Sequence, residues 1–272
     1  MADFLTYLYE TGKEYTTVNV ARSALSALGI IVDGVTVGSH PTIVRLLKGI
    51  FNKKPPRIKH HSIWDADIVL KHLKTKSPLV SLSLKELTLK LSMLIALTKA
   101  ARPQTIHSLT IKNMKISQHE YALELLDLQK HNRPGTNLSS VTIKAFPQDE
   151  DLCVYNALTE YLSRTKDLRK SEDRLFISYI KPHKRVSRDT IRRWLHNTMK
   201  DAGINIEKFG PYSTRSASAS KAAKLNIPID HIMRTAGWSR SSTFEKFYHK
   251  QVEPNLSYEE EMLNISSRTK NT

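Results

Sequence analysis

A tyrosine near the carboxyl end of the sequence stands in a setting where its hydroxyl could do chemistry. Tyr248 lies in the stretch GWSRSSTFEKFYHK, directly before His249 and Lys250. A tyrosine hydroxyl can act as a nucleophile and form a covalent intermediate when neighbouring groups hold and polarise its target. Phe244 and Phe247 precede it at helical spacing, so packing on a helix face is the alternative role. Residues elsewhere in the chain must decide between the two roles.

Two arginines lie at the ends of predicted helices, where they could bind an anion. Arg102 follows a long apolar helical pattern and precedes Pro103, at an end where the helix macrodipole favours a cation. Arg215 falls in the predicted first turn of a helix, where the dipole disfavours a cation unless an anion is bound there. Two guanidinium groups can grip the non-bridging oxygens of one phosphate and stabilise its pentacovalent transition state. The pair therefore indicates phosphoryl-transfer chemistry.

A lysine, a tryptophan and a second tyrosine complete the candidate site. Lys130 lies between two predicted strands, where an exposed hairpin lysine is the alternative, and Lys112 and Lys115 are weaker candidates for the same role. Trp238 follows a glycine and carries an indole N–H that can donate to a phosphate, although packing is its commoner use. Tyr212 stands three residues before the second arginine, after a Gly-Pro turn that also suits a purely structural tyrosine.

These motifs, taken in chain order, resemble those of a known family. Arg102, Lys130, Tyr212-Ser-Thr-Arg215, Gly237-Trp238 and Tyr248 are similar to the motif set of the tyrosine recombinases, also called phage-type integrases. The likeness spans roughly residues 64–255. Phrases such as STRSASASKAAK and AGWSRSSTFEKFYHK look closest to the recombinases of eukaryotic DIRS-like and Crypton-like mobile elements, which would place the protein in the nucleus.

The resemblance implies a mechanism. Tyr248 would attack a DNA phosphodiester, leaving a 3′-phosphotyrosine and a free 5′-hydroxyl, without a metal, a cofactor or ATP. Arg102 and Arg215 would hold the phosphate, Lys130 would protonate the leaving oxygen, and Trp238 would donate to the phosphate or support the site by packing. The protein would bind double-stranded DNA as a dimer on one site and a tetramer on two.

Tyr212 departs from the family pattern, which has a histidine at this position. A phenol, whose pKa is ordinarily about 10, is a poor general base at neutral pH, although it can still donate a hydrogen bond to a phosphate. Either another group or water removes the proton of Tyr248, or the chain is impaired in catalysis. His249 is an uncertain substitute, because consecutive helical residues point apart.

Three functions therefore remain open. A site-specific recombinase or transposon integrase is favoured, and a type IB topoisomerase would share its nucleophile chemistry but not its strand exchange. A DNA-binding protein derived from a recombinase is the alternative that involves no catalysis. Lack of covalent DNA adducts would favour that third reading.

Composition agrees with a nucleic-acid partner. The 272 residues include 42 Lys and Arg against 26 Asp and Glu, a net charge of +16, which favours DNA over an anionic membrane because no long apolar run exists. The single cysteine, Cys153, lies in an apolar pattern and excludes an internal disulfide and any cysteine-based zinc cluster. The N-terminus does not fit a secretory signal, so we expect an intracellular protein.

Periodicity predicts a mainly α-helical chain with a small antiparallel β-sheet in the catalytic domain, arranged as a two-domain DNA clamp. The predicted domains are a helical DNA-binding domain over 1–51, a basic linker over 52–63, a catalytic domain over 64–255 and a tail over 256–272. The tail resembles the segment that docks on a neighbouring protomer, and a solvated terminus is the alternative. Helices are expected over 4–9, 17–30, 41–51, 64–76, 83–101, 151–165, 188–203, 212–226 and 227–237 and around Tyr248, and strands over 109–117, 121–129, 139–146 and 174–178. A capping box of Ser83 with Glu86 is predicted, and Asp151 and Ser187 are predicted cap residues of their helices.

Several basic residues are predicted to contact DNA. The linker would follow the DNA backbone, a loop near residue 184 would contact phosphates, and two consecutive arginines of a helix would reach a groove. Solvated surface charge is the alternative for the loop. The predicted contacts are Lys53, Lys54, Arg57, Lys59, Lys184, Arg185, Arg192 and Arg193.

Overall fold

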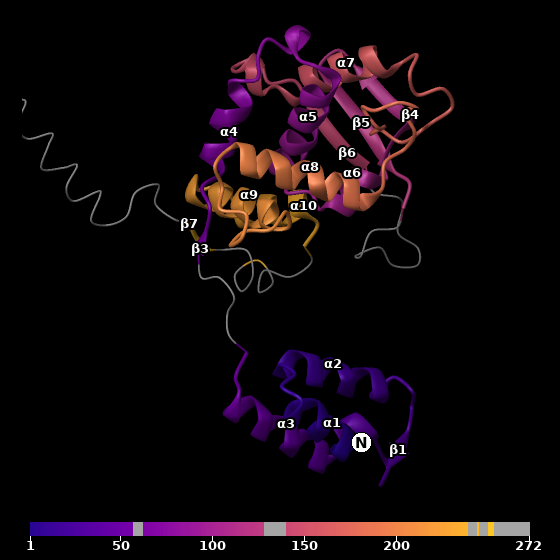
Figure 1. The fold of residues 1–272 in the computed structure, drawn as a ribbon, viewed down its shortest axis with the longest axis vertical. Coiled ribbons are helices and arrows are strands. Elements are labelled where there is room, and N and C mark those ends of the chain that lie inside the picture. Colours follow the sequence, from indigo (N-terminus) through magenta and orange to yellow (C-terminus); the bar gives the residue numbers. More distant parts are fainter. Residues whose placement is uncertain (57–61, 128–139, 239–243, 245–249, 253–272) are drawn as a thin grey trace, which may run out of the picture. The chain divides into compact units, whose positions relative to one another are not determined.

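The chain divides into two compact units, Met1–His60 and His61–Thr272. The structure is a computed structural model, and it describes residues 1–56, 62–127, 140–238, 244 and 250–252 (Figure 1). The prediction of a mainly helical chain with one small antiparallel sheet in the larger unit is confirmed.

The first unit is a three-helix assembly around a small core. Its helices are α1 (Ala2–Glu10), α2 (Tyr15–Ser26) and α3 (Pro41–Lys53). They enclose a cluster that includes Leu5, Val18 and Leu47. Because α3 continues through Lys53, the first two residues of the predicted linker are helical. Residues 57–61 of that linker lie outside the described residues.

The predicted helix over 17–30 is wrong in its last turn. The helix α2 ends at Ser26, and a hairpin of β1 (Ile31–Val32) and β2 (Val35–Thr36) follows. Asp33 and Gly34 form its turn with φ of 50° and 79°. An Asp-Gly pair with positive φ at both positions matches the right-handed twist of a two-residue hairpin. The sequence therefore carried a hairpin signal that the apolar spacing of the segment obscured.

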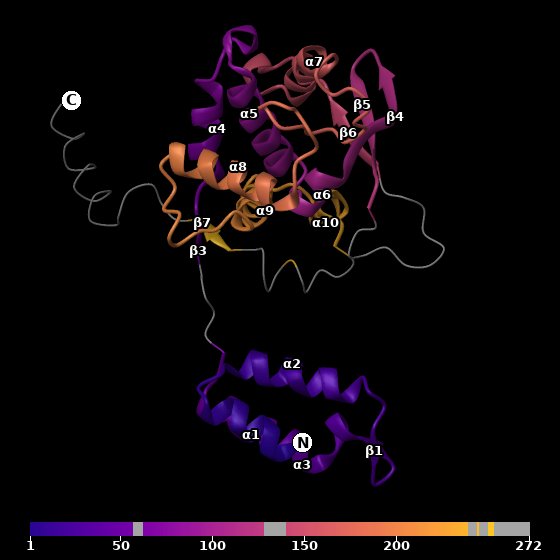
Figure 2. The ribbon, with the colours of Figure 1, turned by 45° about the vertical axis from the view of Figure 1, so that its right-hand side comes forward.

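Seven α-helices of the second unit lie within its described residues. They are α4 (Ala66–Lys74), α5 (Leu84–Thr98), α6 (Pro103–Ser108), α7 (Val154–Thr165), α8 (Arg188–Asp201), α9 (Ser213–Lys224) and α10 (Ile229–Ala236). Helix α5 contacts α6, α7, α8 and α9, and it lies among the other helices in Figures 1 and 2. It is opened by the predicted capping box of Ser83 with Glu86. The central position explains why α5 is apolar on nearly every side.

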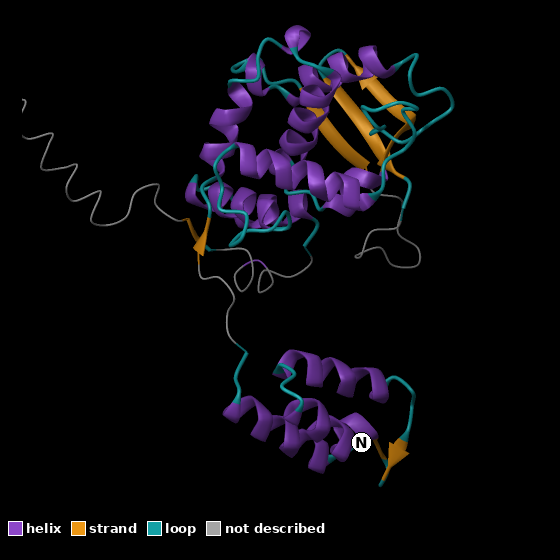
Figure 3. Ribbon diagram, in the orientation of Figure 1, coloured by secondary structure: helices purple, strands orange, loops and turns teal. Residues whose placement is uncertain are grey.

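A three-stranded antiparallel sheet lies at one side of this unit (Figure 3). Its strands are β4 (Leu109–Ser117), β5 (Glu120–Leu125) and β6 (Ser140–Lys144), in the order β4-β5-β6. Alternate residues of β5, including Tyr121 and Leu123, are buried, as the period of two predicted. The hydroxyls of Tyr121 and Thr159 are 3.0 Å apart, which joins the sheet to α7.

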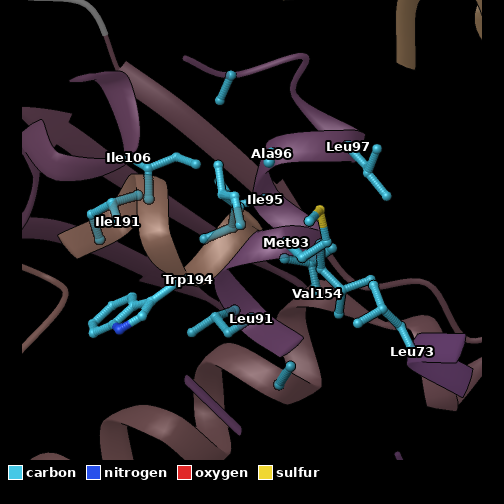
Figure 4. Close-up of a cluster of buried hydrophobic side chains, with 14 of the residues drawn as sticks. Leu73, Leu91, Met93, Ile95, Ala96, Leu97, Ile106, Val154, Ile191 and Trp194 are labelled. Atoms are coloured by element: carbon cyan, nitrogen blue, oxygen red, sulfur yellow. The ribbon is translucent and has the colours of Figure 1, made fainter. Parts of the chain in front are cut away.

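A large hydrophobic cluster joins the sheet to helices α4 to α9, and a smaller one packs Ala219 of α9 against α10, Trp238 and Phe244. Figure 4 shows Leu91, Met93 and Ile95 of α5 close to Trp194 of α8 and Val154 of α7. The largest fully buried side chains of the protein include several α5 leucines. Burying a leucine or an isoleucine contributes about 1.5–3 kcal/mol each, so the large cluster stabilises the second unit.

Two predictions of local structure in this unit are wrong. Residues 174–178 form no strand but only isolated bridges, Thr110 with Arg174 and Ile177 with Arg185. Asp151 does not cap α7, because it lies inside a 3-10 turn, Glu150–Leu152, whose cap is Asp149. The predicted N-cap of α8 at Ser187 is confirmed, since its hydroxyl accepts from the Thr190 N–H.

A short parallel pairing that was not predicted joins the beginning of the second unit to a segment nearly 190 residues later, a separation of 189 positions between Ser62 and Gln251. Strand β3 (Ser62–Ile63) pairs with β7 (Gln251–Val252), and Figures 1 and 2 show them side by side. Two-residue strands carry no recognisable period, so only the tertiary fold reveals them. No helix in the described part of the chain has the length and apolar character needed to cross a bilayer.

Candidate active site

Arg102 lies at the start of a helix and not at the end of one. Helix α5 ends at Thr98, and the chain turns through Ala100, whose φ is 44°. Arg102 is then the N-cap residue of α6, with Pro103 at the first helical position. The predicted placement at a helix C-terminus is therefore wrong, because Pro103 opens a second helix. The macrodipole does not account for this cation, and an anion near it would.

Arg215 lies in the first turn of α9, as predicted, and is buried. One terminal nitrogen donates to the Ala100 carbonyl at 2.5 Å, and the other donates to the Ala236 carbonyl. These two carbonyls belong to the turn after α5 and to the last residue of α10. The planar guanidinium is thus held in one orientation by two elements other than its own helix.

The two arginines line one cavity of about 300 Å³. Its walls come from the α5–α6 junction, the facing ends of β5 and β6, the start of α9 and the end of α10. Two further cations line it, Lys99 and Arg234, and none of the described lining residues is acidic. A cavity with this lining suits an anion that accepts several hydrogen bonds, such as a phosphodiester. The lining residues are Lys99, Ala101, Arg102, Thr105, Leu125, Ser140, Val141, Thr142, Arg215, Arg234, Thr235, Ala236 and Gly237.

Trp238 packs behind this cavity. Gly237 ends α10 in the left-handed region with φ of 64°, and the Trp238 N–H bonds back to the Met233 carbonyl at 2.9 Å. The indole ring lies beneath Arg215, with the guanidinium carbon 4.4 Å from the ring centroid. Its other neighbour is Phe244, which is fully buried, with ring centroids 5.7 Å apart. Trp238 therefore connects Arg215 to the segment that leads to Tyr248.

Two of the predicted catalytic residues, Tyr248 and Lys130, lie outside the described residues. The nearest described residues before and after Tyr248 are Phe244 and Lys250. Phe244, four positions earlier, packs on Trp238, and the Lys250 N–H, two positions later, donates to the Ser220 hydroxyl of α9 at 3.1 Å.

Tyr212 does not share the environment of Arg215. It is the N-cap residue of α9, its side chain is 55% exposed, and it does not line the cavity. Arg192 of α8 lies over its ring, with the guanidinium carbon 5.9 Å from the centroid. The next residue, Ser213, accepts a 2.7 Å hydrogen bond from the Trp64 indole. The described contacts of Tyr212 are therefore those of a surface residue.

Three residues near the site were not found from the sequence. Lys99 and Arg234 line the cavity, and Asp127 binds Ser108 at the end of α6, the helix that Arg102 precedes. Lys99 and Arg234 carry no motif, because each lies in an ordinary helical pattern and only the tertiary fold brings them to the cavity. Burial lowers the pKa of Lys99, and the nearby charge of Lys144 lowers it further.

Asp127 follows β5 and forms two 3.0 Å hydrogen bonds with the Arg174 guanidinium. It also accepts from the Ser108 hydroxyl at 2.8 Å. The bonds from Arg174 are the main reason that the pKa of Asp127 falls to about 2, and burial opposes them. Because Ser108 ends α6, this carboxylate ties the helix that begins at Arg102 to the end of β5.

The predicted DNA contacts that the structure describes are mostly exposed. Lys184, Arg185, Arg192 and Arg193 are exposed, with Arg192 paired to a helix neighbour. Lys53 ends α3, whereas Lys54 is paired with Glu14 at 3.0 Å and donates to the Gly12 carbonyl. Arg57 and Lys59 lie outside the described residues. Lys112 and Lys115 are exposed on β4, and neither lines the cavity.

No group of three or more His, Cys, Asp or Glu side chains gathers in a metal-binding arrangement within the described ranges. The cations described above are thus the groups of the cavity that can neutralise an anion.

The chain matches a known protein family in sequence and several solved structures in fold. Residues 69–253 match the family described as the phage integrase family. The fold resembles XerH site-specific recombinase bound to palindromic difH substrate in a post-cleavage complex, with a TM-score of 0.62 and 15% identity over 100% of this chain and 71% of that one. It resembles the Tn1549 transposon integrase in complex with transposon right end DNA, with a TM-score of 0.62 and 13% identity over 98% of this chain and 84% of that one. It also resembles a lambda integrase dimer bound to a COC' core site, with a TM-score of 0.54 and 16% identity over 94% of this chain and 66% of that one. None of the curated protein sequences matches the chain.

Proposed function

Because the chain belongs to the phage integrase family, we propose that it is a site-specific DNA recombinase or transposon integrase that acts through a covalent phosphotyrosine. The observation that carries this proposal is the single cavity lined by Arg102 and Arg215, with two more cations and no acidic side chain among its described residues. A phosphodiester in a transition state gains negative charge, and preorganised donors aimed at that charge are the largest single source of rate enhancement.

In the proposed reaction, the Tyr248 oxygen attacks the phosphorus and the 5′-oxygen leaves. The bond energy is kept in the 3′-phosphotyrosine, so attack by a 5′-hydroxyl can rejoin the strands without ATP. Arg102 and Arg215 hold the non-bridging oxygens. The sequence pattern assigns protonation of the leaving oxygen to Lys130 and a supporting or donor role to Trp238.

The setting of Arg215 supports its role. Its guanidinium is held by the Ala100 and Ala236 carbonyls and by the Trp238 ring before any substrate arrives. A donor that is already oriented costs little reorganisation when the transition state forms. Arg102 differs, because it is only partly buried and donates to no carbonyl among the residues that the structure describes, so we infer that its side chain can adjust to the phosphate.

We also propose that the chain binds duplex DNA, as a dimer on one site and a tetramer on two. The net charge of +16 and the exposed cations around Lys184 and Arg192 support DNA binding, because phosphate contacts supply most of the affinity. Lambda integrase has been solved as a dimer on a core site and as a tetramer on a Holliday junction. The proposed domains stay those of the sequence: 1–51 for DNA binding, 52–63 as linker, 64–255 for catalysis and 256–272 as a tail.

The narrower assignments rest on sequence phrases alone. The likeness to DIRS-like and Crypton-like recombinases, and with it a nuclear location, stays a prediction from STRSASASKAAK and AGWSRSSTFEKFYHK. Microscopy of a tagged chain in eukaryotic cells tests the nuclear location, and exclusion of the tagged chain from the nucleus would contradict it.

A DNA-binding protein without catalysis is the second candidate, and one observation favours it. Tyr212 occupies the position of the family histidine, is exposed and does not line the cavity. On this reading the arginine cavity would bind the DNA backbone, and no strand would be cut.

The test uses a pool of nicked duplexes of randomised sequence, in which cleavage beside the nick releases a short fragment and traps the intermediate. We expect a DNA adduct that survives denaturing electrophoresis, and recombinant products when two copies of the selected site share a plasmid. DNA binding without an adduct would support the non-catalytic reading. Relaxation of supercoils without recombinants would support a topoisomerase.

A further inference from the structure

The first described residues of the second unit contact the helix that carries Arg215. Residues Ser62–Ile63 form β3, and Trp64 follows directly. Trp64 is buried, and its indole N–H donates to the Ser213 hydroxyl at 2.7 Å, across 149 positions of sequence. Ser213 is the first residue of α9, and Arg215 lies in the first turn of that helix. Trp64 therefore contacts the exact start of the helix that holds a proposed phosphate donor.

The same segment also holds the chain shortly after the proposed nucleophile. Strand β3 pairs with β7, which begins three positions after Tyr248 in the sequence, and Figures 1 and 2 show the two strands together. The Lys250 N–H donates to the Ser220 hydroxyl of α9, and both β3 and β7 contact α9. Residues 62–64 thus pack α9 together with the strand that follows the nucleophile.

The bond between Trp64 and Ser213 depends on the identity of both side chains. An indole N–H donates and cannot accept, and a serine hydroxyl can accept from it. A buried indole N–H that loses its acceptor is unfavourable, so the bond resists displacement of Ser213. Phenylalanine would keep an aromatic ring at position 64 but would have no N–H to donate.

The other hydrogen bonds described at the start of α9 are local. The Ser213 N–H donates to the Gly210 carbonyl at 2.8 Å. The Thr214 hydroxyl donates to the Pro211 carbonyl at 2.7 Å. These bonds shape the turn that leads into α9, but they do not join the turn to another element. The bond from Trp64 supplies that connection.

We propose that Trp64 is a positioning residue for the candidate active site. Its hydrogen bond to Ser213 sets where α9 begins, and through that helix it sets the position of the Arg215 guanidinium in the cavity. A displacement of about 1 Å in a group that binds the reacting atoms can slow a reaction about 100-fold. Trp64 does not line the cavity, so its effect passes through α9. This inference rests on the proposed recombinase function.

The test is a double-mutant cycle on single-turnover cleavage of a nicked duplex that carries the selected site, at saturating DNA. Trp64→Phe removes the N–H and keeps a ring, and Ser213→Ala removes the acceptor. We expect each to slow cleavage about 10-fold and to leave the dissociation constant for DNA within a few fold of the wild type. Because both remove the same bond, the double variant should also be about 10-fold slower and not about 100-fold.

Two further variants separate positioning from a general loss of stability. Ser213→Thr keeps a hydroxyl and should restore most of the rate that Ser213→Ala loses. Tyr121→Phe is the matched control, because it removes the 3.0 Å contact with the Thr159 hydroxyl from a side chain that does not line the cavity. That contact joins the sheet to α7 and not to α9, so the control should cleave at the wild-type rate. Urea unfolding compares the stability of all variants.

The inference is overturned if folded Ser213→Ala cleaves at the wild-type rate, a result that stands even where Trp64→Phe fails to fold. It is also overturned if the two losses multiply in the double variant, or if Tyr121→Phe loses as much cleavage at an equal loss of stability. A wild-type protein that binds DNA but forms no adduct would instead refute the proposed function itself.

Discussion

The guanidinium of Arg215 lies over the indole ring of Trp238, with its central carbon 4.4 Å from the ring centroid. The same group donates to the Ala100 and Ala236 carbonyls, so its plane is set by contacts from two helix ends and one ring. A cation over a tryptophan that is shielded from water gains about 2 kcal/mol. This contact joins the residue that would bind the phosphate to the segment that carries Tyr248.

Substitutions of Trp238 test this contact. Trp238→Ala should lower the free energy of unfolding by about 3–5 kcal/mol, because the ring is buried between Arg215 and Phe244. Trp238→Phe should lower it less and keep more of the cleavage activity, since it retains an aromatic face. Urea unfolding and adduct yield measure both effects. Equal losses for the two variants would argue against a role for the aromatic face.

Arg102 and Arg215 should differ when each is replaced by alanine. Both variants should lose cleavage by about 100-fold or more, because each removes a transition-state donor. Only Arg215→Ala should also lose stability, by about 2–3 kcal/mol, since the buried Ala100 and Ala236 carbonyls lose a charged donor. Arg102→Ala should unfold near the wild-type urea midpoint. A destabilised Arg102→Ala or wild-type cleavage in either variant would contradict the account.

Asp127→Asn tests, through pH, the carboxylate that ties α6 to the end of β5. The pKa of Asp127 is lowered from 3.8 to about 2 in the folded protein, so its contribution is present above about pH 4 and is lost as the pH falls towards 2. The full shift would correspond to more than 2 kcal/mol, but the side chain is 34% exposed, so we expect about 1 kcal/mol.

The measurement is urea unfolding of Asp127→Asn and wild type between pH 2 and 7. The difference in unfolding free energy should be largest above pH 4 and should shrink below it. A difference that stays constant over this range would show that the ionised carboxylate contributes nothing.

Tyr212→His restores the side chain that the family pattern has at this position. We expect cleavage to stay within a few fold of the wild type, because this position is exposed and does not line the cavity, so an imidazole there does not reach the phosphate site. Stability should change by less than about 0.5 kcal/mol, since the residue is exposed. The measurement is the initial rate of adduct formation by Tyr212→His and by the wild type. A fall in this rate would mean that the site is adapted to the phenol.

Much of the fold was readable from local patterns. The helix caps at Ser83 and Ser187 and the alternation of β5 are short-range signals, and each is confirmed. Pro103 was misread, because a proline that ends one helix can equally open the next. The pairing of β3 with β7 could not be predicted from local patterns, since it joins residues far apart in the chain.

The site was only partly predictable for the same reason. Local pattern placed Arg215 in the first turn of a helix, and the unfavourable helix dipole at that position marked it as a candidate anion-binding residue. Lys99, Arg234 and Asp127 sit in ordinary patterns, and they acquire a role only where α5, α10 and β5 converge. The exposure of Tyr212 was equally hidden, because its spacing from Arg215 says nothing of which way the N-cap side chain points.

The central claim is that Tyr248 carries the DNA. The most direct measurement is to trap the adduct on the nicked duplex pool, digest the protein and locate the modified residue by mass spectrometry. The account predicts a nucleotide on Tyr248, and no adduct from Tyr248→Phe while its DNA affinity stays within a few fold of the wild type. A nucleotide on any other residue, or an undiminished adduct in Tyr248→Phe, would contradict it.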